Sequence, residues 1–458
     1  MSYREFKGTY VAKRYCAGTT YEYTVRVPDA PEGTEYAVLV THDRMNWVEA
    51  DAMDVLAARG EAPWCVTVGM PAGDMMPTLE GGFSRHMRAH DYDFFAPAYA
   101  NLFVEEFIPY ICEKYGIRLS PDPDIHAVSG GSSGAMSAWN LLWFRNDYFR
   151  RGRLCSPSFI AIGRGREVPE IIRKCETKPI RAYVVHYEHE PDDYFCSSHC
   201  AAEDGIRAMK YAGYDIEERY FPGEAHCGRT LTQSTSEEIF AWLWKDWKTC
   251  RVATTRNSPR HDYVISYNDP LEDVTDTDTM PTPVPALSSV GTYTAEDGKV
   301  YLERDGERRV VADDFLCTPT VAVSSDLWRL YMADPARGSV HVASICEDGS
   351  LKDEKVLAPL YTAFDFRRPG AYDICVDEAD RVFAATEQGI QCIRSFGLVD
   401  VILNPPEGRV ARRVAFGGEG RQYLYADCGD RLYRRKMLRP AKCDPLAVTE
   451  PGCKQYYD

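Results

Sequence analysis

The chain has 458 residues, of which 45% are hydrophobic and 27% charged, and its formal net charge is −16. Its length exceeds the roughly 100–200 residues of a usual domain, so two domains are expected. The acidic balance argues against binding of nucleic acid or of an anionic membrane, because both need a basic surface. The composition supplies ample apolar residues for cores, so no long disordered stretch is expected.

The distribution of apolar residues and cysteines bears on the cellular location. No apolar run approaches the roughly 18 residues that a membrane-spanning helix needs. The first residues lead directly into a polar, strand-like segment, and no secretory leader is visible there. The 16 cysteines are scattered singly, which is typical of reduced thiols. A cytoplasmic location is therefore expected.

Residues 1–250 alternate between strand-like and helix-like patterns. Short apolar strands separated by amphipathic helices predict a mainly parallel sheet that is covered on both faces. The expected strands are Tyr21–Val27, Tyr36–Val40, Trp64–Val68, Ala182–Val185 and Ile216–Phe221, and the expected helices are Phe95–Tyr115, Ser133–Phe144, Glu203–Ala212 and Ser236–Trp247.

The pattern changes after Cys250. Residues 251–285 are predicted to be a linker, since Thr275–Pro285 is polar and rich in proline. Residues 286–440 lack a helical period and show short strands with turn signals, in units spaced by about forty to fifty residues. That period suits propeller blades, and the length allows three or four of them. Residues 441–458 form a C-terminal tail.

The segment Gly130-Gly131-Ser132-Ser133-Gly134 fits the pattern G-x-S-x-G between a short strand and a helix. Small residues are needed there because a nucleophilic serine sits on a strained strand-to-helix turn. The start of the following helix offers free N–H groups to a developing oxyanion. Of the neighbouring serines, Ser132 alone has the correct glycine offsets. The alternative is a glycine-rich turn without catalytic function.

A serine nucleophile needs a base, and His226 follows the last predicted strand as a catalytic histidine should. An acid that holds the imidazole is expected in the acidic loop after Ala182–Val185. Four carboxylates compete for this role on sequence grounds: Glu188, Glu190, Asp192 and Asp193.

Residues 15–250 resemble the enterochelin-esterase-like branch of the α/β-hydrolases, which includes feruloyl and other carbohydrate esterases. The elbow at Ser132 carries this resemblance together with further motifs. These are Gly18–Pro28, His42–Trp47, Ser84-Arg85 followed by Asp91–Asp93, the predicted helix Phe103–Ile111, and Gly213–Asp215.

The resemblance implies an α/β-hydrolase sandwich and a serine carboxylic-ester hydrolase that works through an acyl-enzyme. It implies a hydroxycinnamoyl (feruloyl-type) or other carbohydrate-linked ester as substrate, and Glu190 as the acid where relatives carry an aspartate. The oxyanion hole would consist of the N–H of Ser133 and that of Asp43 or Arg44. Arg44 stands where relatives have glycine, so it is expected to narrow the mouth or to contact an acidic group of the substrate.

The C-terminal part contains four motifs, Leu330–Pro335, Gly370–Asp373, Ala385–Gln391 and Asp430–Arg435. Through these motifs it resembles gluconolactonase-like propeller domains. Two metal-ligand positions of those lactonases correspond here to Pro319 and Tyr372, neither of which supplies a hard-oxygen ligand for calcium or magnesium. We therefore expect a non-catalytic partial propeller. Its exposed strand edges need covering, which favours homo-oligomerisation through this domain.

Two alternative functions are a metal-dependent lactonase acting through the propeller and a non-catalytic scaffold on a hydrolase fold. Cys196, His199 and Cys200 have metal-ligand residue types but lack a matching second pair. No cofactor and no metal are therefore expected. The expected partner is a small-molecule or oligosaccharide ester.

Overall fold

The computed structural model divides the chain into two compact units, Met1–Arg173 with Thr177–Thr255 and Lys174–Glu176 with Arg256–Asp458. The described residues are 2–160, 162–194, 196–228, 231–249, 251–252, 261, 264–265, 271–364, 370–406 and 408–449. No helix within these ranges is long and apolar enough to cross a membrane.

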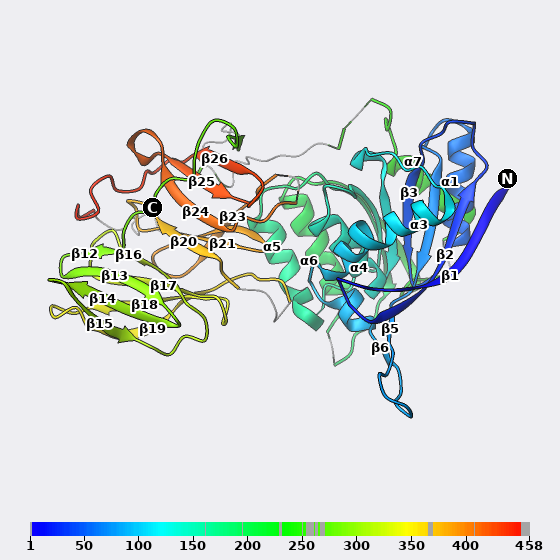
Figure 1. Ribbon diagram of the computed structural model, residues 1–458. Coiled ribbons are helices and arrows are strands. Elements are labelled where there is room, and N and C mark those ends of the chain that lie inside the picture. The colour runs from blue at the N-terminus through cyan, green and yellow to red at the C-terminus, as the bar shows by residue number, and fades with distance from the viewer. Residues whose placement is uncertain are drawn as a thin grey trace. The chain divides into compact units, whose positions relative to one another are not determined.

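The first unit is built on a ten-stranded sheet whose centre is parallel (Figure 1). The strand order is β10-β9-β8-β7-β3-β4-β2-β5-β6, and β1 pairs with β2. The six strands β10, β9, β8, β7, β3 and β4 are all parallel to their neighbours in this group. The strands are β1 Tyr3–Val11, β2 Thr19–Pro28, β3 Ala37–His42, β4 Cys65–Met70, β5 Asp74–Met75, β6 Arg85–His86, β7 Ala127–Gly131, β8 Arg151–Cys155, β9 Arg181–His189 and β10 Asp215–Ala225.

Helices cover both faces of this sheet, as the run of fully buried residues in β3 and β4 requires. On one face Leu56 and Phe240, from α1 and α7, pack in a common core with Leu39. On the other face α4 packs so closely that a Cβ on Gly152 would lie 2.6 Å from Leu142. The helices are α1 Trp47–Ala58, α2 Ala98–Leu102, α3 Ile108–Tyr115, α4 Ser133–Phe144, α5 Val168–Lys174, α6 Ser198–Tyr211 and α7 Gln233–Leu243.

The helix expected over Phe95–Tyr115 is irregular. It consists of α2, a π-helical turn at Phe103–Phe107, and α3. The residues at both junctions keep helical dihedral angles, so the helix runs on from Ala98 to Tyr115 through the π-helical turn. Pro109 follows this turn directly and cannot donate a backbone hydrogen bond within the helix.

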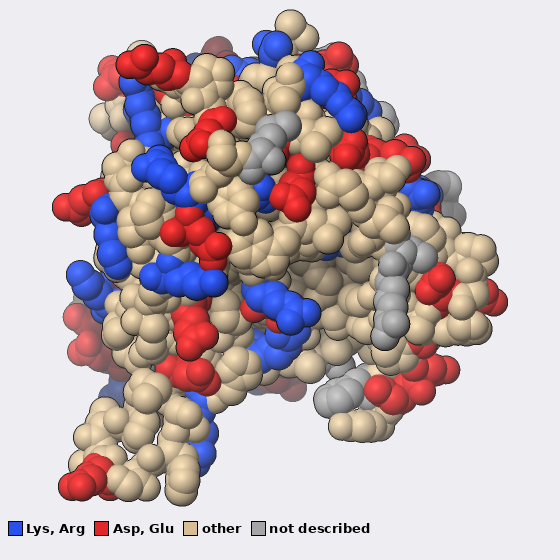
Figure 2. All heavy atoms as spheres, turned by 90° about the vertical axis from the view of Figure 1, so that its right-hand side faces the viewer, with Lys and Arg blue, Asp and Glu red and all other residues tan. Residues whose placement is uncertain are grey.

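A hairpin of β5 and β6 projects from the first unit (Figures 1 and 2). Its connecting loop exposes two large apolar side chains, Leu79 and Phe83, which are 81% and 82% exposed. On the face drawn in Figure 2, acidic and basic side chains are interspersed rather than gathered by sign.

The second unit contains four four-stranded antiparallel sheets arranged as a partial propeller, in which the first strands of successive sheets lie next to one another. Residues of β16 and β20, with Lys442, line a pocket of about 150 Å³. The sheets are β12 Leu287–Ser288, β13 Gly291–Glu296, β14 Lys299–Arg304 and β15 Glu307–Ala312; β16 Thr320–Val323, β17 Arg329–Asp334, β18 Ser339–Ile345 and β19 Leu351–Pro359; β20 Asp373–Val376, β21 Val382–Thr386, β22 Gly389–Ile393 and β23 Val399–Leu403; and β24 Arg413–Gly417, β25 Tyr423–Asp427, β26 Leu432–Lys436 and β11 Glu272–Asp273.

The fourth sheet is completed by β11, which pairs with β26 although it precedes the first sheet in the chain. The described part of the expected linker 251–285 thus supplies one strand of the propeller; residues 253–260, 262–263 and 266–270 lie outside the described residues. In the expected tail, Thr449 donates its N–H to the carbonyl of Ser325 at 3.1 Å, and residues 450–458 lie outside the description.

Candidate active site

Ser132 lies between the end of β7 and the start of α4 with φ 56° and ψ −124°. A non-glycine residue in this region is strained and holds its side chain clear of the sheet. The neighbouring glycines allow the turn, because a Cβ on Gly130 would lie 2.1 Å from the carbonyl oxygen of Gly134. A Cβ on Gly134 would in turn lie 3.1 Å from the carboxylate of Asp43. The local geometry is that of a nucleophile elbow.

A buried charge network supports the strand that leads to Ser132. Arg153 and Glu49 form an ion pair at 2.7 Å, with side chains 5% and 1% exposed. Ser129, on β7, donates to Glu49 and accepts from Arg153, each at 2.9 Å. Because both charges are paired and hydrogen-bonded, their burial is tolerated beneath the elbow.

His226 directly follows β10, and its Nδ1 is hydrogen-bonded to Oε2 of Glu190. The side chain of Glu190 is 1% exposed, whereas that of His226 is 26% exposed. Glu190 also accepts from the hydroxyl of Ser156 at 2.6 Å and from the N–H of Tyr187 at 3.2 Å. Burial raises the pKa of Glu190, but these three hydrogen bonds outweigh it and hold that pKa below its usual value. An ionised Glu190 favours the tautomer with the imidazole proton on Nδ1, in which Nε2 carries a free lone pair.

The histidine loop and the elbow are in contact. A Cβ on Gly131 would lie 3.1 Å from the sulfur of Cys227, the residue after His226. The N–H of Ser132 donates to the carbonyl of Cys155 at 2.9 Å, and the sulfurs of Cys155 and Cys227 are 4.0 Å apart. Contact with the Cys227 thiol lowers the pKa of Cys155, against the effect of burial.

The hydroxyl of Ser132 lies 3.3 Å from the hydroxyl of Ser158. Within the described residues no hydrogen bond joins Ser132 to His226. Contacts of this kind are often long or misaligned without substrate. Neither Ser156 nor Ser158 carries a sequence signal, because both follow a strand without any motif and approach the site only through the fold.

The other candidate acids lie elsewhere. Glu188 accepts the N–H of Gly223 at 2.6 Å, and Asp192 and Asp193 are exposed. Of the four carboxylates that compete in the sequence, the structure brings Glu190 to the imidazole.

The expected oxyanion-hole residues surround the start of α4. Ser133 is its first residue, and such residues have N–H groups without partners inside the helix. The N–H of Asp43 donates to the hydroxyl of Tyr92 at 2.7 Å, and its carboxylate is paired with Arg88. No hydrogen bond to the N–H of Arg44 is formed by the part of the chain that the structure describes. The N–H of Asp43, by contrast, is already engaged with Tyr92.

Within the described residues, Cys196, His199 and Cys200 are not among the groups whose ligand atoms lie within 4.8 Å of one another. His199 and Cys200 lie on α6, where His199 approaches Glu203 at 3.4 Å. In the second unit, the hydroxyl of Tyr372 donates to Glu387 at 2.8 Å. Among the described residues, the ligand-type group that does come together is Cys16, His90 and Asp91.

Comparisons with known proteins concern the fold. No protein-family model and no curated protein matches the chain. Among solved structures, a ferulic acid esterase is 19% identical, with 53% of this chain and 98% of that one covered and a TM-score of 0.40. The enterobactin esterase of Shigella flexneri is 16% identical, with 54% of this chain and 60% of that one covered and a TM-score of 0.38. A gluconolactonase from Xanthomonas campestris is 22% identical, with 30% of this chain and 44% of that one covered and a TM-score of 0.26. The resemblance to feruloyl and enterochelin esterases and the resemblance to gluconolactonases, both expected from the sequence, recur among these matches.

Proposed function

We propose that the chain is a serine carboxylic-ester hydrolase whose triad is Ser132, His226 and Glu190. The observation that carries the proposal is the buried, ionised Glu190 bonded to Nδ1 of His226, next to a serine in a nucleophile-elbow conformation. These are the parts that acyl transfer needs: a nucleophile, a base with a free Nε2, and an acid that fixes the tautomer.

The reaction proceeds in two steps. The Ser132 hydroxyl turns from Ser158 to Nε2 of His226, gives up its proton there, and bonds to the ester carbonyl carbon. The N–H groups of Ser133 and Arg44 stabilise the oxyanion. His226 then protonates the leaving alcohol as the carbon–oxygen bond breaks, which leaves an acyl-enzyme. Water, deprotonated by His226, attacks the acyl carbon and releases the acid and the serine.

The substrate class that we propose is a hydroxycinnamoyl or other carbohydrate-linked ester. It rests on the resemblance of residues 15–250 to feruloyl and related esterases. Screening methyl ferulate against aryl acetates tests this choice separately from the triad.

The experiment that tests the triad compares Ser132→Ala with Ser137→Ala on an aryl acetate. Ser137 is the matched control: it lies on α4, is 0% exposed, and its hydroxyl has no hydrogen-bond partner in the described structure. Ser132→Ala should lower kcat by about 10⁴-fold or more while the thermal unfolding curve stays unchanged. Ser137→Ala should keep nearly full activity. Undiminished turnover by Ser132→Ala would rule out the proposed nucleophile.

A further inference from the structure

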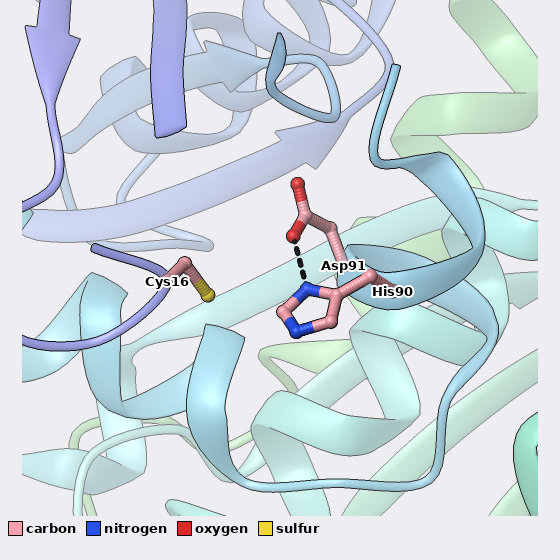
Figure 3. A group of neighbouring side chains, drawn as sticks. All are labelled: Cys16, His90 and Asp91. Carbon is pink, nitrogen blue, oxygen red and sulfur yellow. Dashed lines mark hydrogen bonds and ion pairs between the residues drawn. The ribbon is translucent and has the colours of Figure 1, made fainter. Parts of the chain in front are cut away.

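Three ligand-type side chains from two distant parts of the sequence point toward one another in the first unit (Figure 3). Cys16 lies in the turn between β1 and β2, and His90 and Asp91 lie in a π-helical turn, Ala89–Asp93. One ligand atom from each lies within 4.8 Å of the other two. Nδ1 of His90 is 3.0 Å from Oδ1 of Asp91. A modest contraction would bring all three atoms to a single ion.

The turn that carries Cys16 is held in place by one carboxylate. Glu106 accepts the N–H groups of Lys13, Arg14 and Tyr15, at 2.9, 3.1 and 2.7 Å. These bonds fix the backbone immediately before Cys16, which has a φ of 53°. The turn that carries the thiol is therefore tied to Glu106 by three hydrogen bonds.

Asp91 is equally constrained. Its side chain is 0% exposed, and Oδ2 accepts the N–H of Gly73 at 2.9 Å. Oδ1 is thereby left facing His90, whose side chain is 39% exposed. The group thus combines a buried carboxylate with an imidazole that solvent reaches, which provides an entry path for an ion.

A buried tyrosine hydroxyl provides an independent indication of a missing ligand. Tyr99 is 2% exposed, and its hydroxyl makes no hydrogen bond with a described residue. The charges of Asp91 and Cys16 act on this hydroxyl, so it lies beside the cluster. Burial of a hydroxyl without a partner is unfavourable. A water bound to an ion at the cluster would give this hydroxyl a partner.

We propose that Cys16, His90 and Asp91 bind one zinc ion, with water as the fourth ligand. Thiolate, imidazole and carboxylate are the ligands that zinc accepts in tetrahedral sites, whereas calcium and magnesium prefer oxygen ligands alone. On binding, the Cys16 thiol releases its proton to solvent. His90 coordinates through Nδ1 with its proton on Nε2, and the bond between His90 and Asp91 gives way to two bonds to the ion.

The role of the ion follows from what flanks its ligands. Arg88 and Tyr92, on either side of His90 and Asp91, both contact Asp43 in the loop next to the elbow. Zinc would tie the turn of Cys16 to this segment and so restrain the loop that supplies the second oxyanion donor. The ion itself takes no part in the ester chemistry.

The test is metal binding by the full-length chain after treatment with a chelator. Cobalt is the first probe, because a thiolate ligand gives it a sulfur-to-metal charge-transfer absorption. One equivalent of cobalt should produce this band in the wild type, and zinc should displace it. Cys16→Ser should lose the band, and zinc competed against a chromophoric chelator should bind at least about 100-fold more weakly than to the wild type. His90→Asn should weaken zinc binding to a similar extent.

Cys200→Ser is the matched control, since Cys200 is an exposed cysteine of the other ligand-type group. It should keep the cobalt band and the zinc affinity of the wild type. The inference is overturned if the band is absent from the wild type, if it persists in Cys16→Ser, or if Cys200→Ser removes it. None of these readouts depends on ester hydrolysis, so they leave the proposed triad untouched.

Discussion

Glu190 and His226 are brought together by the register of two neighbouring parallel strands. His189, the last residue of β9, pairs with Ala225, the last residue of β10. The residues that follow, Glu190 and His226, therefore leave the sheet side by side, and the N–H of His226 donates to the carbonyl of His189 at 3.1 Å. The bond between the carboxylate and Nδ1 follows from this register.

Replacement of Glu190 by glutamine should lower kcat by about 10³–10⁴-fold. The amide can donate to Nδ1 and so stabilise the tautomer whose proton lies on Nε2, where the base must be free. Kinetics on an aryl ester, with KM measured separately, check this expectation. Glu188→Gln is the control, because Glu188 bonds to Gly223 instead. Equal losses in the two variants would contradict the assignment of the acid.

Replacement of Gly130 by alanine should destabilise the first unit and lower activity. The added Cβ would lie 2.1 Å from the carbonyl oxygen of Gly134, within backbone that cannot yield. Overpacking of this kind costs about 3 kcal/mol, measured as the free energy of unfolding in urea. Gly213→Ala serves as the comparison: its φ is +76° but nothing lies within 4 Å, so only the backbone cost of about 1–2 kcal/mol is expected. A smaller loss for Gly130→Ala than for Gly213→Ala would argue against a tightly packed elbow.

The stability of the first unit should fall as the pH is lowered from about 6.5 towards 4, in part because of His126. Its Nδ1 accepts the N–H of Val38 at 3.1 Å, and its Nε2 donates to the carbonyl of Ser120 at 2.9 Å, so the ring is held neutral. Burial lowers the pKa of His126 from 6.5 to about 4. Between these values the unfolded chain binds a proton that the folded chain does not. The contribution of His126 to the free energy of unfolding is therefore complete above pH 6.5. It falls by about 3 kcal/mol in total as the pH drops towards 4.

Urea unfolding of the wild type and of His126→Gln at pH 7 and pH 4.5 measures this contribution. The variant should be less stable at pH 7, and its stability should depend less steeply on pH. Identical slopes for the two proteins would show that His126 is not the group responsible.

Local sequence patterns predict those helices and strands whose ends and buried faces are specified by neighbouring residues in the chain. The helix expected over Ser133–Phe144 has these bounds in the structure, because the glycines before it and the apolar residues within it specify both its start and its packing. The strand β11, by contrast, lies within residues 251–285, which the sequence predicts to be a linker. Its pairing with β26 is a long-range contact that no local pattern reveals.

In the candidate site too, local sequence patterns predict some residues, whereas others are brought in by long-range contacts. Ser132 and His226 were recognisable because the elbow and the end of a strand are local features. The choice of Glu190 among four carboxylates depends on the register of β9 with β10. The bond from Asp43 to Tyr92, the contact of Ser132 with Ser158, and the grouping of Cys16 with His90 all join segments far apart in the sequence. Residue spacing alone does not indicate such contacts.

The most direct test of the central claim is labelling of the intact protein with a fluorophosphonate, followed by peptide mapping of the adduct. The probe reacts with a serine only when a base and an oxyanion hole activate it. A single adduct on Ser132, absent from Ser132→Ala and much slower to form in a variant of His226, is the predicted result. Folded wild-type protein that forms no adduct, or an adduct on another serine, would contradict the proposed triad.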